Sequence, residues 1–165
     1  MAVSDIINGA NAGLVKVANV YVSKLKTRIS QNNLPKAISD AISIGVPQSA
    51  GKMVSIDVAI DLKKAPMAAA YEWGSGIHSM LKEPQKYVIV PRRGRYLVIP
   101  KERLKYPPEH GDYLIVRKVL HPGVAPRQYI TPSLAEMPKE IKQILGKEFK
   151  AAIMIGINPI TTLQG

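Results

Sequence analysis

The chain has 165 residues, of which 46% are hydrophobic and 21% charged, and this length and composition favour one folded domain over a disordered chain. Lysine and arginine outnumber aspartate and glutamate by 23 to 12, so the formal net charge of +11 predicts attraction to polyanions or to acidic protein surfaces. The absence of cysteine excludes thiol chemistry, and the lack of a signal-like start or of an apolar run of about 18 residues predicts a protein made in the cytosol.

Two helices are predicted near the amino terminus. Apolar residues recur at helical spacing from Val3 to Ile29, which indicates one long amphipathic helix. Pro35 is placed to open a shorter helix through Ile44, because proline suits the first helical position. We expect the loop that follows, Gln48–Lys52, to be mobile.

One strand and a short helix come next. Apolar and polar residues alternate from Met53 to Leu62, which indicates a strand with one buried face. The apolar face would carry Val54, Ile56, Val58, Ile60 and Leu62. The alanine-rich stretch from Pro66 to Tyr71 predicts a short helix that stops at Gly74.

The middle of the chain predicts a cationic β-hairpin. Lys86–Pro91 and Arg95–Pro100 are rich in β-forming residues and flank Arg92-Arg93-Gly94, so the two runs would pair and present a basic tip. Eight lysines and arginines lie between Lys82 and Lys105 against two glutamates, more than half of the excess positive charge. The residues expected to contact a partner or DNA are Arg92, Arg93, Arg95, Lys101 and Arg103.

Three roles stay open for this hairpin. It is a solvated loop, a contact with an acidic protein neighbour, or a contact with a nucleic-acid backbone. Tyr87, Tyr96 or Tyr106 could stack on bases, although Tyr87 and Tyr96 also suit packing within the hairpin. No helix-turn-helix or zinc-finger pattern favours the nucleic-acid role.

A strand and a long helix are predicted to close the fold. Tyr113–Leu120 has the composition of a strand, and Thr131 can cap a helix that begins at Pro132 and runs to about Ile155. The element order predicts an α+β domain over residues 1–156, with the two long helices packed on one face of an antiparallel sheet. Residues 79–112 would form the inserted, protruding hairpin, and residues 157–165 a tail.

The sequence carries no convincing catalytic, metal or cofactor set. The histidines lack the spacing that puts two metal ligands on one helix; they are His78, His110 and His121. Gly74-Ser75-Gly76 is too short for a nucleophile elbow. A hydrolase that uses Asp57, Asp61, Glu72 and a histidine is conceivable, but polar residues on the solvated face of a strand explain both aspartates more simply.

Two separated motifs carry a resemblance to a known family. The first is Ala70-Tyr71-Glu72-Trp73-Gly74-Ser75-Gly76, and the second runs from Val119 through His121-Pro122-Gly123 and Tyr129 to Leu134. Together they resemble the tail-completion and neck proteins of tailed double-stranded-DNA bacteriophages, with Ser75 in place of the family's threonine and Tyr129 in place of its phenylalanine. The resemblance follows the element order from Val3 to Ile155, and the region from Ser79 to Asp112 has no counterpart.

The resemblance implies a structural virion protein without catalysis or a cofactor, made in the host cytoplasm. It would form a homo-oligomeric ring of six or twelve subunits at the head-to-tail joint, around the DNA channel. Its partners would be neighbouring neck, portal-adaptor or tail proteins and, through non-specific contact, the packaged DNA, with no membrane. The alternative function is a stand-alone basic DNA-binding module.

The motif residues have expected roles in the fold or in subunit contacts. They are Glu72, Trp73, Gly74, His121, Pro122, Gly123 and Tyr129. Gly74 can adopt a positive φ after its helix, and Pro122 stiffens the turn around it. We expect Trp73 to be buried beneath the final helix, and Tyr129 to anchor the approach to that helix in the core.

Overall fold

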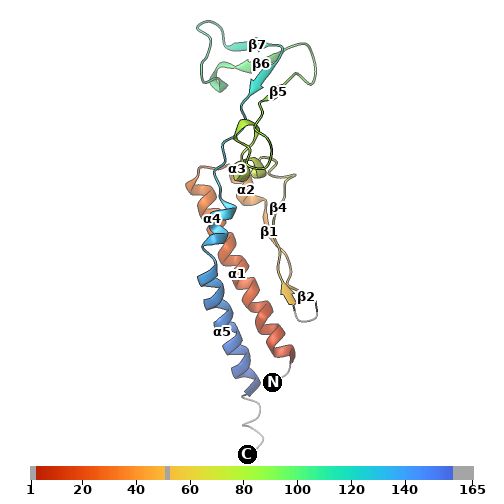
Figure 1. The fold of residues 1–165 in the computed structure, drawn as a ribbon, viewed down its shortest axis with the longest axis vertical. Coiled ribbons are helices and arrows are strands. Elements are labelled where there is room, and N and C mark those ends of the chain that lie inside the picture. The colour runs from red at the N-terminus through yellow and green to blue at the C-terminus, as the bar shows by residue number, and fades with distance from the viewer. Residues whose placement is uncertain (1–2, 51–52, 158–165) are drawn as a thin grey trace, which may run out of the picture. The chain divides into compact units, whose positions relative to one another are not determined.

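The chain forms two compact units in the computed structural model, which describes residues 3–50 and 53–157 (Figure 1). Unit 1 comprises Met1–Glu72 and Gln128–Gly165, and unit 2 comprises Trp73–Arg127. The chain therefore leaves unit 1 after Glu72 and returns to it at Gln128. The predicted insertion at residues 79–112 lies inside unit 2, which begins earlier and ends later.

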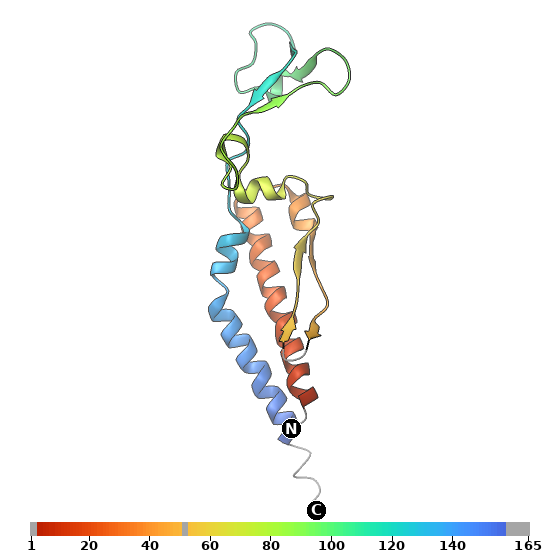
Figure 2. The same cartoon turned by 45° about the vertical axis from the view of Figure 1, so that its right-hand side comes forward.

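Two long helices form the frame of unit 1. Helix α1 (Val3–Gln31) and helix α5 (Pro138–Ile157) lie side by side and run in opposite directions (Figure 2). The long first helix predicted from the apolar periodicity is confirmed, since Leu25 and Ile29 are buried and Lys26 is exposed. The predicted α+β class is also confirmed, because long helices at both ends accompany antiparallel strands.

The second predicted helix is shorter than expected. Helix α2 (Lys36–Asp40) ends before strand β1 (Ile42–Ile44), so the prediction of a helix through Ile44 is wrong. Isoleucine is β-branched and favours strands, and Ile42 and Ile44 are half-buried while Ser43 between them is exposed. This alternation of period two outweighs the helical signal of Pro35.

A long antiparallel hairpin completes unit 1. Strand β1 pairs with β4 (Val58–Ile60), and β2 (Gln48–Ala50) pairs with β3 (Met53–Ser55). The Gly45 N–H donates to the Asp57 carbonyl over 2.8 Å and links the two ladders. Residues 48–50, predicted as part of a mobile loop, are thus a strand, and residues 51–52 of that loop lie outside the described residues.

The single strand predicted from Met53 to Leu62 is wrong, because β3 and β4 are separate strands, but its alternation of burial is confirmed as far as Ile60. Val54, Ile56, Val58 and Ile60 are half-buried, and the residues between them are exposed. Leu62 departs from the pattern because it is 54% exposed. Strand β4 ends at Ile60, and the Asp61 carboxylate accepts the Lys63 N–H over 2.8 Å to begin a turn. Side chains alternate between two faces only within a strand, so Leu62 is not expected to follow the pattern.

The hydrophobic core lies entirely in unit 1. It is formed where α1, α2, the segment leading into α3 (Ala68–Trp73) and the start of α4 (Ile130–Ala135) meet. Each fully buried leucine or isoleucine contributes about 2 kcal/mol to the stability of the fold. The core residues are Leu25, Ile29, Leu34, Ile38, Ala41, Ala65, Ala68 and Tyr129.

The closing helix is broken into two. The predicted single helix from Thr131 to Ile155 is wrong, because α4 ends at Ala135 and α5 starts at Pro138. Proline has no N–H to donate and its ring clashes with the preceding turn, so Pro138 can open a helix but not continue one. Most of the predicted tail, residues 158–165, lies outside the described residues.

Unit 2 is a β-ribbon with two short 3₁₀ helices, η1 (Gly76–His78) and η2 (Lys101–Arg103). Strand β5 (Tyr87–Ile89) pairs with β8 (Val119–His121), and β6 (Leu97–Pro100) pairs with β7 (Tyr113–Val116). The predicted hairpin of Lys86–Pro91 with Arg95–Pro100 is therefore wrong, since its two strands do not pair with each other. Each pairs instead with a strand of the segment that returns to unit 1: β5 pairs with β8 and β6 pairs with β7. More than twenty residues lie between β5 and β8.

Candidate functional site

The carboxylate of Glu72 caps helix α4 from another part of the chain. Its Oε2 accepts the N–H groups of Tyr129 and Ile130 over 2.7 and 2.8 Å, and its Oε1 accepts the N–H of Thr131 over 2.9 Å. Thr131 also donates its hydroxyl to Oε1 over 2.7 Å. The first N–H groups of a helix have no partner within the helix, so one buried side chain satisfies the whole start of α4.

This arrangement corrects the predicted role of Thr131 as a helix cap. Helix α4 begins at Ile130, and the residue before it, Tyr129, makes no capping bond with its own side chain. Thr131 is a donor to the cap instead of the cap itself. Because Glu72 lies 59 positions away in the sequence, a search for a cap beside the helix could not find it.

The environment of Glu72 favours its ionised form. Its side chain is fully buried, and burial alone would raise the pKa of the carboxyl. The hydrogen bonds from Ile130, Thr131 and Tyr129 together outweigh burial and hold the pKa below its ordinary value. A negative charge at the start of a helix is also favoured by the helix dipole.

Tyr129 is the second fixed point of this site. It is 0% exposed, as expected for an anchor in the core, and its hydroxyl donates to the Ala68 carbonyl over 3.2 Å. Ser133 donates its hydroxyl to the Tyr129 carbonyl over 2.6 Å. Burial, and then the negative charge of Glu72, raise the pKa of Tyr129 to about 12, so the phenol stays neutral.

The remaining motif residues form two interlocked turns in unit 2. The Ser75 N–H donates to the Val124 carbonyl over 2.9 Å, and the Ile77 N–H donates to the Pro122 carbonyl over 2.8 Å. The Ser75 hydroxyl accepts the Val124 N–H over 2.9 Å. The segment after α3 and the segment after β8 are therefore bonded to each other in both directions.

Glycine is required where these turns touch. Gly76 and Gly123 have φ angles of 62° and 100°, which residues with a Cβ rarely adopt. A Cβ on Gly76 would lie 2.1 Å from the Pro122 carbonyl oxygen, and one on Gly123 would lie 1.9 Å from that of Ser75. The two backbones approach so closely that no side chain fits between them.

Three further motif residues lie in or next to these turns. Gly74 has a φ of 72°, and a Cβ there would lie 2.1 Å from the His78 carbonyl oxygen. His121 is exposed, and its Nδ1 accepts the Gly123 N–H over 3.0 Å, which stiffens its own turn. Trp73 is 37% exposed, so the prediction that it is buried beneath the final helix is wrong.

The basic residues singled out in the sequence lie on the ribbon of unit 2. Arg92, Arg93 and Arg95 are exposed in the segment that joins β5 to β6. Lys101 and Arg103 lie in η2, beyond the end of β6, and are half-buried and exposed respectively. The predicted single strand Tyr113–Leu120 is wrong, because β7 and β8 are separate strands. Arg117 and Lys118, which that strand would contain, lie between the two and were not predicted as contact residues.

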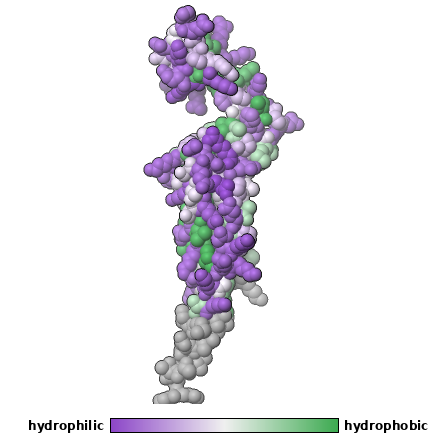
Figure 3. Space-filling model, turned by 90° about the vertical axis from the view of Figure 1, so that its left-hand side faces the viewer, coloured by the Kyte–Doolittle hydropathy of each residue, from purple (hydrophilic) through white to green (hydrophobic). Residues whose placement is uncertain are grey.

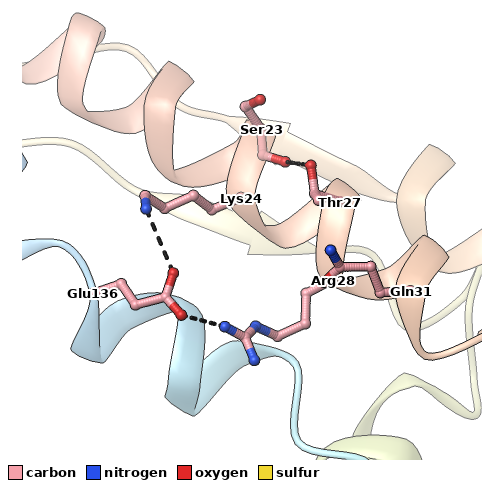
Figure 4. A pocket seen from close by; sticks show the side chains of 6 residues that line it. All are labelled: Ser23, Lys24, Thr27, Arg28, Gln31 and Glu136. Carbon is pink, nitrogen blue, oxygen red and sulfur yellow. Dashed lines mark hydrogen bonds and ion pairs between the residues drawn. The ribbon is translucent and has the colours of Figure 1, made fainter.

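Ion pairs bind α1 to the closing helices of unit 1. Lys24 lies 3.4 Å from Glu136 and 3.0 Å from Glu140, and Arg28 pairs with Glu136 as well (Figure 4). Lys24, Arg28 and Glu136 line a polar hollow with Ser23, Thr27 and Gln31. The hydrogen bond from Lys24 lowers the pKa of Glu140. The charges of this hollow are thus engaged with one another across two helices.

A second hollow in unit 1 is apolar. It has a volume of about 500 Å³ and lies where α1, the segment from β3 to β4 and the closing helices approach one another. Figure 3 shows that the face on the helical side of unit 1 is largely hydrophilic, with a hydrophobic area over the helices. The apolar residues of the hollow are Leu14, Val17, Ala18, Tyr21, Ile56, Val58, Leu134, Met137 and Ile141.

The carboxylates considered for hydrolysis are not gathered into one site. Asp57 is exposed on the hairpin, Asp61 bonds the turn after β4, and Glu72 is engaged by α4. Within the described ranges, no group of three histidine, aspartate or glutamate side chains is placed to hold a metal ion. No described helix combines the length and the apolar character needed to cross a membrane.

Comparisons of the chain with family models, with curated proteins and with solved structures found no match. The family resemblance therefore rests on the two motifs. What the structure adds is their placement: Glu72 is bonded to the backbone of Tyr129, and the Gly74–Gly76 turn is bonded to the turn at Pro122–Val124.

Proposed function

We propose that this protein is a structural subunit of the neck of a tailed bacteriophage. Copies of the chain assemble into a homo-oligomeric ring at the head-to-tail joint, around the DNA channel. A closed ring needs only one interface, repeated from each copy to the next. The ring contacts neighbouring neck, portal-adaptor or tail proteins in the virion.

The observation that carries this proposal is the missing core of unit 2. Every buried hydrophobic side chain in the described part of the chain belongs to unit 1. A two-stranded ribbon is at best marginally stable alone, and exposed apolar patches mark surfaces that partners cover. The aliphatic side chains of the strands that stay between 42% and 62% exposed are Val88, Ile89, Val98, Ile115 and Leu120.

The motif residues support a structural role for the site. Glu72 accepts four hydrogen bonds from the start of α4, so its carboxylate is fully engaged in holding the fold. Gly76 and Gly123 are needed for the close backbone approach. These residues fix the point at which the chain leaves unit 1 and the turns with which unit 2 begins and ends.

Native mass spectrometry and electron micrographs of the purified full chain test assembly. We expect a single closed oligomer that appears as a ring. Val88→Lys, which places a charge on an exposed position of β5, should break the oligomer, whereas Leu62→Lys, at a similarly exposed position of unit 1, should not. A chain that stays monomeric at high concentration, or equal effects of the two variants, would contradict this part of the proposal.

Particle assembly tests the place in the virion. Without this chain, the phage that encodes it should accumulate filled heads separate from tails, and purified protein added to that extract should restore joining. Normally joined particles made without the chain would overturn the proposal. A monomer that binds DNA and is absent from particles would instead favour the stand-alone DNA-binding module.

A further inference from the structure

We propose that unit 2 binds the phosphodiester backbone of nucleic acid through one cationic cluster. The cluster consists of Arg92, Arg93, Arg95, Arg117 and Lys118. This inference concerns unit 2 by itself and goes beyond assembly, because it names a ligand and the residues that hold it. It holds or fails independently of whether copies of the chain form a ring.

The strand register places these five residues in the interval between the two ladders. Ile89 pairs with Val119 at the end of the β5–β8 ladder, and Leu97 pairs with Val116 at the start of the β6–β7 ladder. Residues 90–96 on one side of the ribbon therefore face only residues 117 and 118 on the other. The excess residues must bulge out, so Arg92, Arg93 and Arg95 emerge opposite Arg117 and Lys118.

The positive charge of the cluster is not neutralised within the protein. All five side chains are exposed, and none forms an ion pair with a carboxylate of the described residues. Residues 84–101 and 113–127 contain no aspartate or glutamate. Unit 2 as a whole has eleven lysines and arginines against four acidic residues. A cluster of like charges on a two-stranded ribbon favours a polyanionic ligand.

Two exposed tyrosines of unit 2 lie beside cations, Tyr96 next to a residue of the cluster and Tyr106 next to Lys105 outside it. The Arg117 guanidinium lies 5.9 Å from the centre of the Tyr96 ring, and the Lys105 ammonium lies 5.3 Å from that of Tyr106. Tyr96 is 49% exposed and Tyr106 is 82% exposed, so both rings keep a surface on which bases can stack. The hairpin in which Tyr96 is expected to pack does not form, and Tyr96 contacts Arg117 of the returning segment instead.

The chemistry favours phosphate over the carboxylates of an acidic protein. Four of the five cations are arginines, whose planar guanidinium bonds phosphate with two parallel N–H groups and stacks on bases. Gly94 has a φ of 84° and open space around it, so the backbone at the centre of the bulge can also approach a ligand closely. Exposed tyrosines add affinity for a nucleic acid, because bases can stack on their rings, whereas an acidic peptide has no bases.

Fluorescence anisotropy with the full chain tests the proposal. The probes are a 30-base-pair duplex, a single strand of the same length and poly-glutamate, titrated at about 50, 100 and 200 mM salt. The test variant is the triple change Arg92→Gln, Arg93→Gln, Arg95→Gln. The matched control removes three exposed charges from α5, through Lys142→Gln, Lys147→Gln and Lys150→Gln.

We expect the wild-type protein to bind nucleic acid with a steep salt dependence, because each phosphate contact releases counterions. The arginine variant should lose at least about tenfold in affinity, and the negative slope of its log K against log salt should become shallower by about 3. The lysine control should stay within about threefold of the wild type. Tighter binding of the duplex or of the single strand identifies which form of backbone fits.

Three results would overturn the proposal. They are no binding to either nucleic acid at low salt, equal losses in the two triple variants, and binding of poly-glutamate as tightly as of nucleic acid. Circular dichroism checks that both variants fold, which is expected because all six side chains are exposed. Native mass spectrometry of the same samples scores assembly, so a failure of DNA binding is separated from a failure of ring formation.

Discussion

The Glu72 side chain supplies the hydrogen-bond acceptors for the first N–H groups of α4, which a helix normally obtains from a residue beside its start. Removing the carboxylate would leave the N–H groups of three consecutive residues, 129 to 131, without their acceptor at the edge of the core. Each buried donor left without a partner costs about 1–3 kcal/mol. Glu72 therefore couples the end of α3 to the start of α4, and losing its carboxylate would leave several N–H donors without an acceptor, which the loss of an apolar packing residue does not do.

The change Glu72→Gln should lower the free energy of unfolding by about 3 kcal/mol, because the new amide group places N–H donors against backbone N–H groups. Urea unfolding followed by circular dichroism measures the loss. Glu136→Gln is the matched control, since that carboxylate forms ion pairs at the surface and should cost less than about 1 kcal/mol. Equal losses would contradict the capping role.

Stability should also depend on pH through Glu72. Its pKa is held below the ordinary value of 4.5, so the folded state binds the proton more weakly than the unfolded state does. The stabilisation is fully present above pH 4.5 and is lost as pH falls through the lower, folded-state pKa. Urea unfolding between pH 7 and pH 3 should show this decline, and Glu72→Gln should flatten it. A decline that is unchanged in the variant would assign it to other carboxylates.

The elements differ in how far local sequence determines them. Helix α1 and the alternation from Val54 to Ile60 could be predicted, because the periodicity of burial lies within the element itself. The pairing of β5 with β8 could not, because the nearest β-rich run suggests a hairpin while the true partner is chosen by contacts distant in sequence. The same holds for the cap of α4, which comes from Glu72.

The break between α4 and α5 shows a different limit. Pro132 and Pro138 both fit a first helical position, and only the second begins a long helix. The apolar stripe is continuous from Leu134 onwards and favours one helix from Thr131, whereas Pro138 inside it favours a break. The buried Met137 between the two helices keeps the stripe continuous across the break.

The interlocked turns of unit 2 give a test at the level of the element. Gly76→Ala should destabilise the turns by about 3 kcal/mol or more, because the new Cβ meets the Pro122 carbonyl oxygen in addition to the strain of a positive φ. Gly94→Ala is the control: its φ is also positive but the space around it is open, so it should cost about 1 kcal/mol.

Hydrogen exchange of the Ser75 and Ile77 amides reports on this pair of variants directly, because both amides bond across the turns. Gly76→Ala should speed their exchange far more than Gly94→Ala does. If the two variants exchange alike, conformational strain alone explains the effect, and the close approach of the backbones is not needed.

At the scale of the molecule, unit 1 provides the stable core and unit 2 provides exposed contact surface. Unit 1 holds the core, the ion pairs between α1 and the closing helices, and the Glu72 cap. Unit 2 holds the cationic cluster and exposed aliphatic strands, with glycine-dependent turns in place of a core. A fold of this kind can change its contact surface without loss of the stable part, because none of the described residues of unit 2 belongs to the core.

This division predicts that unit 1 folds without unit 2. The Glu72 carboxylate accepts the N–H of Tyr129, so a short glycine-serine linker can replace residues 73–127 between positions that are already close. The shortened chain should keep its helical circular dichroism and unfold cooperatively within a few degrees of the full chain. Adding Glu72→Gln should destabilise it by the same amount as in the full protein, since the cap and its partners all lie in unit 1. Non-cooperative unfolding of the shortened chain would show that the core depends on the ribbon.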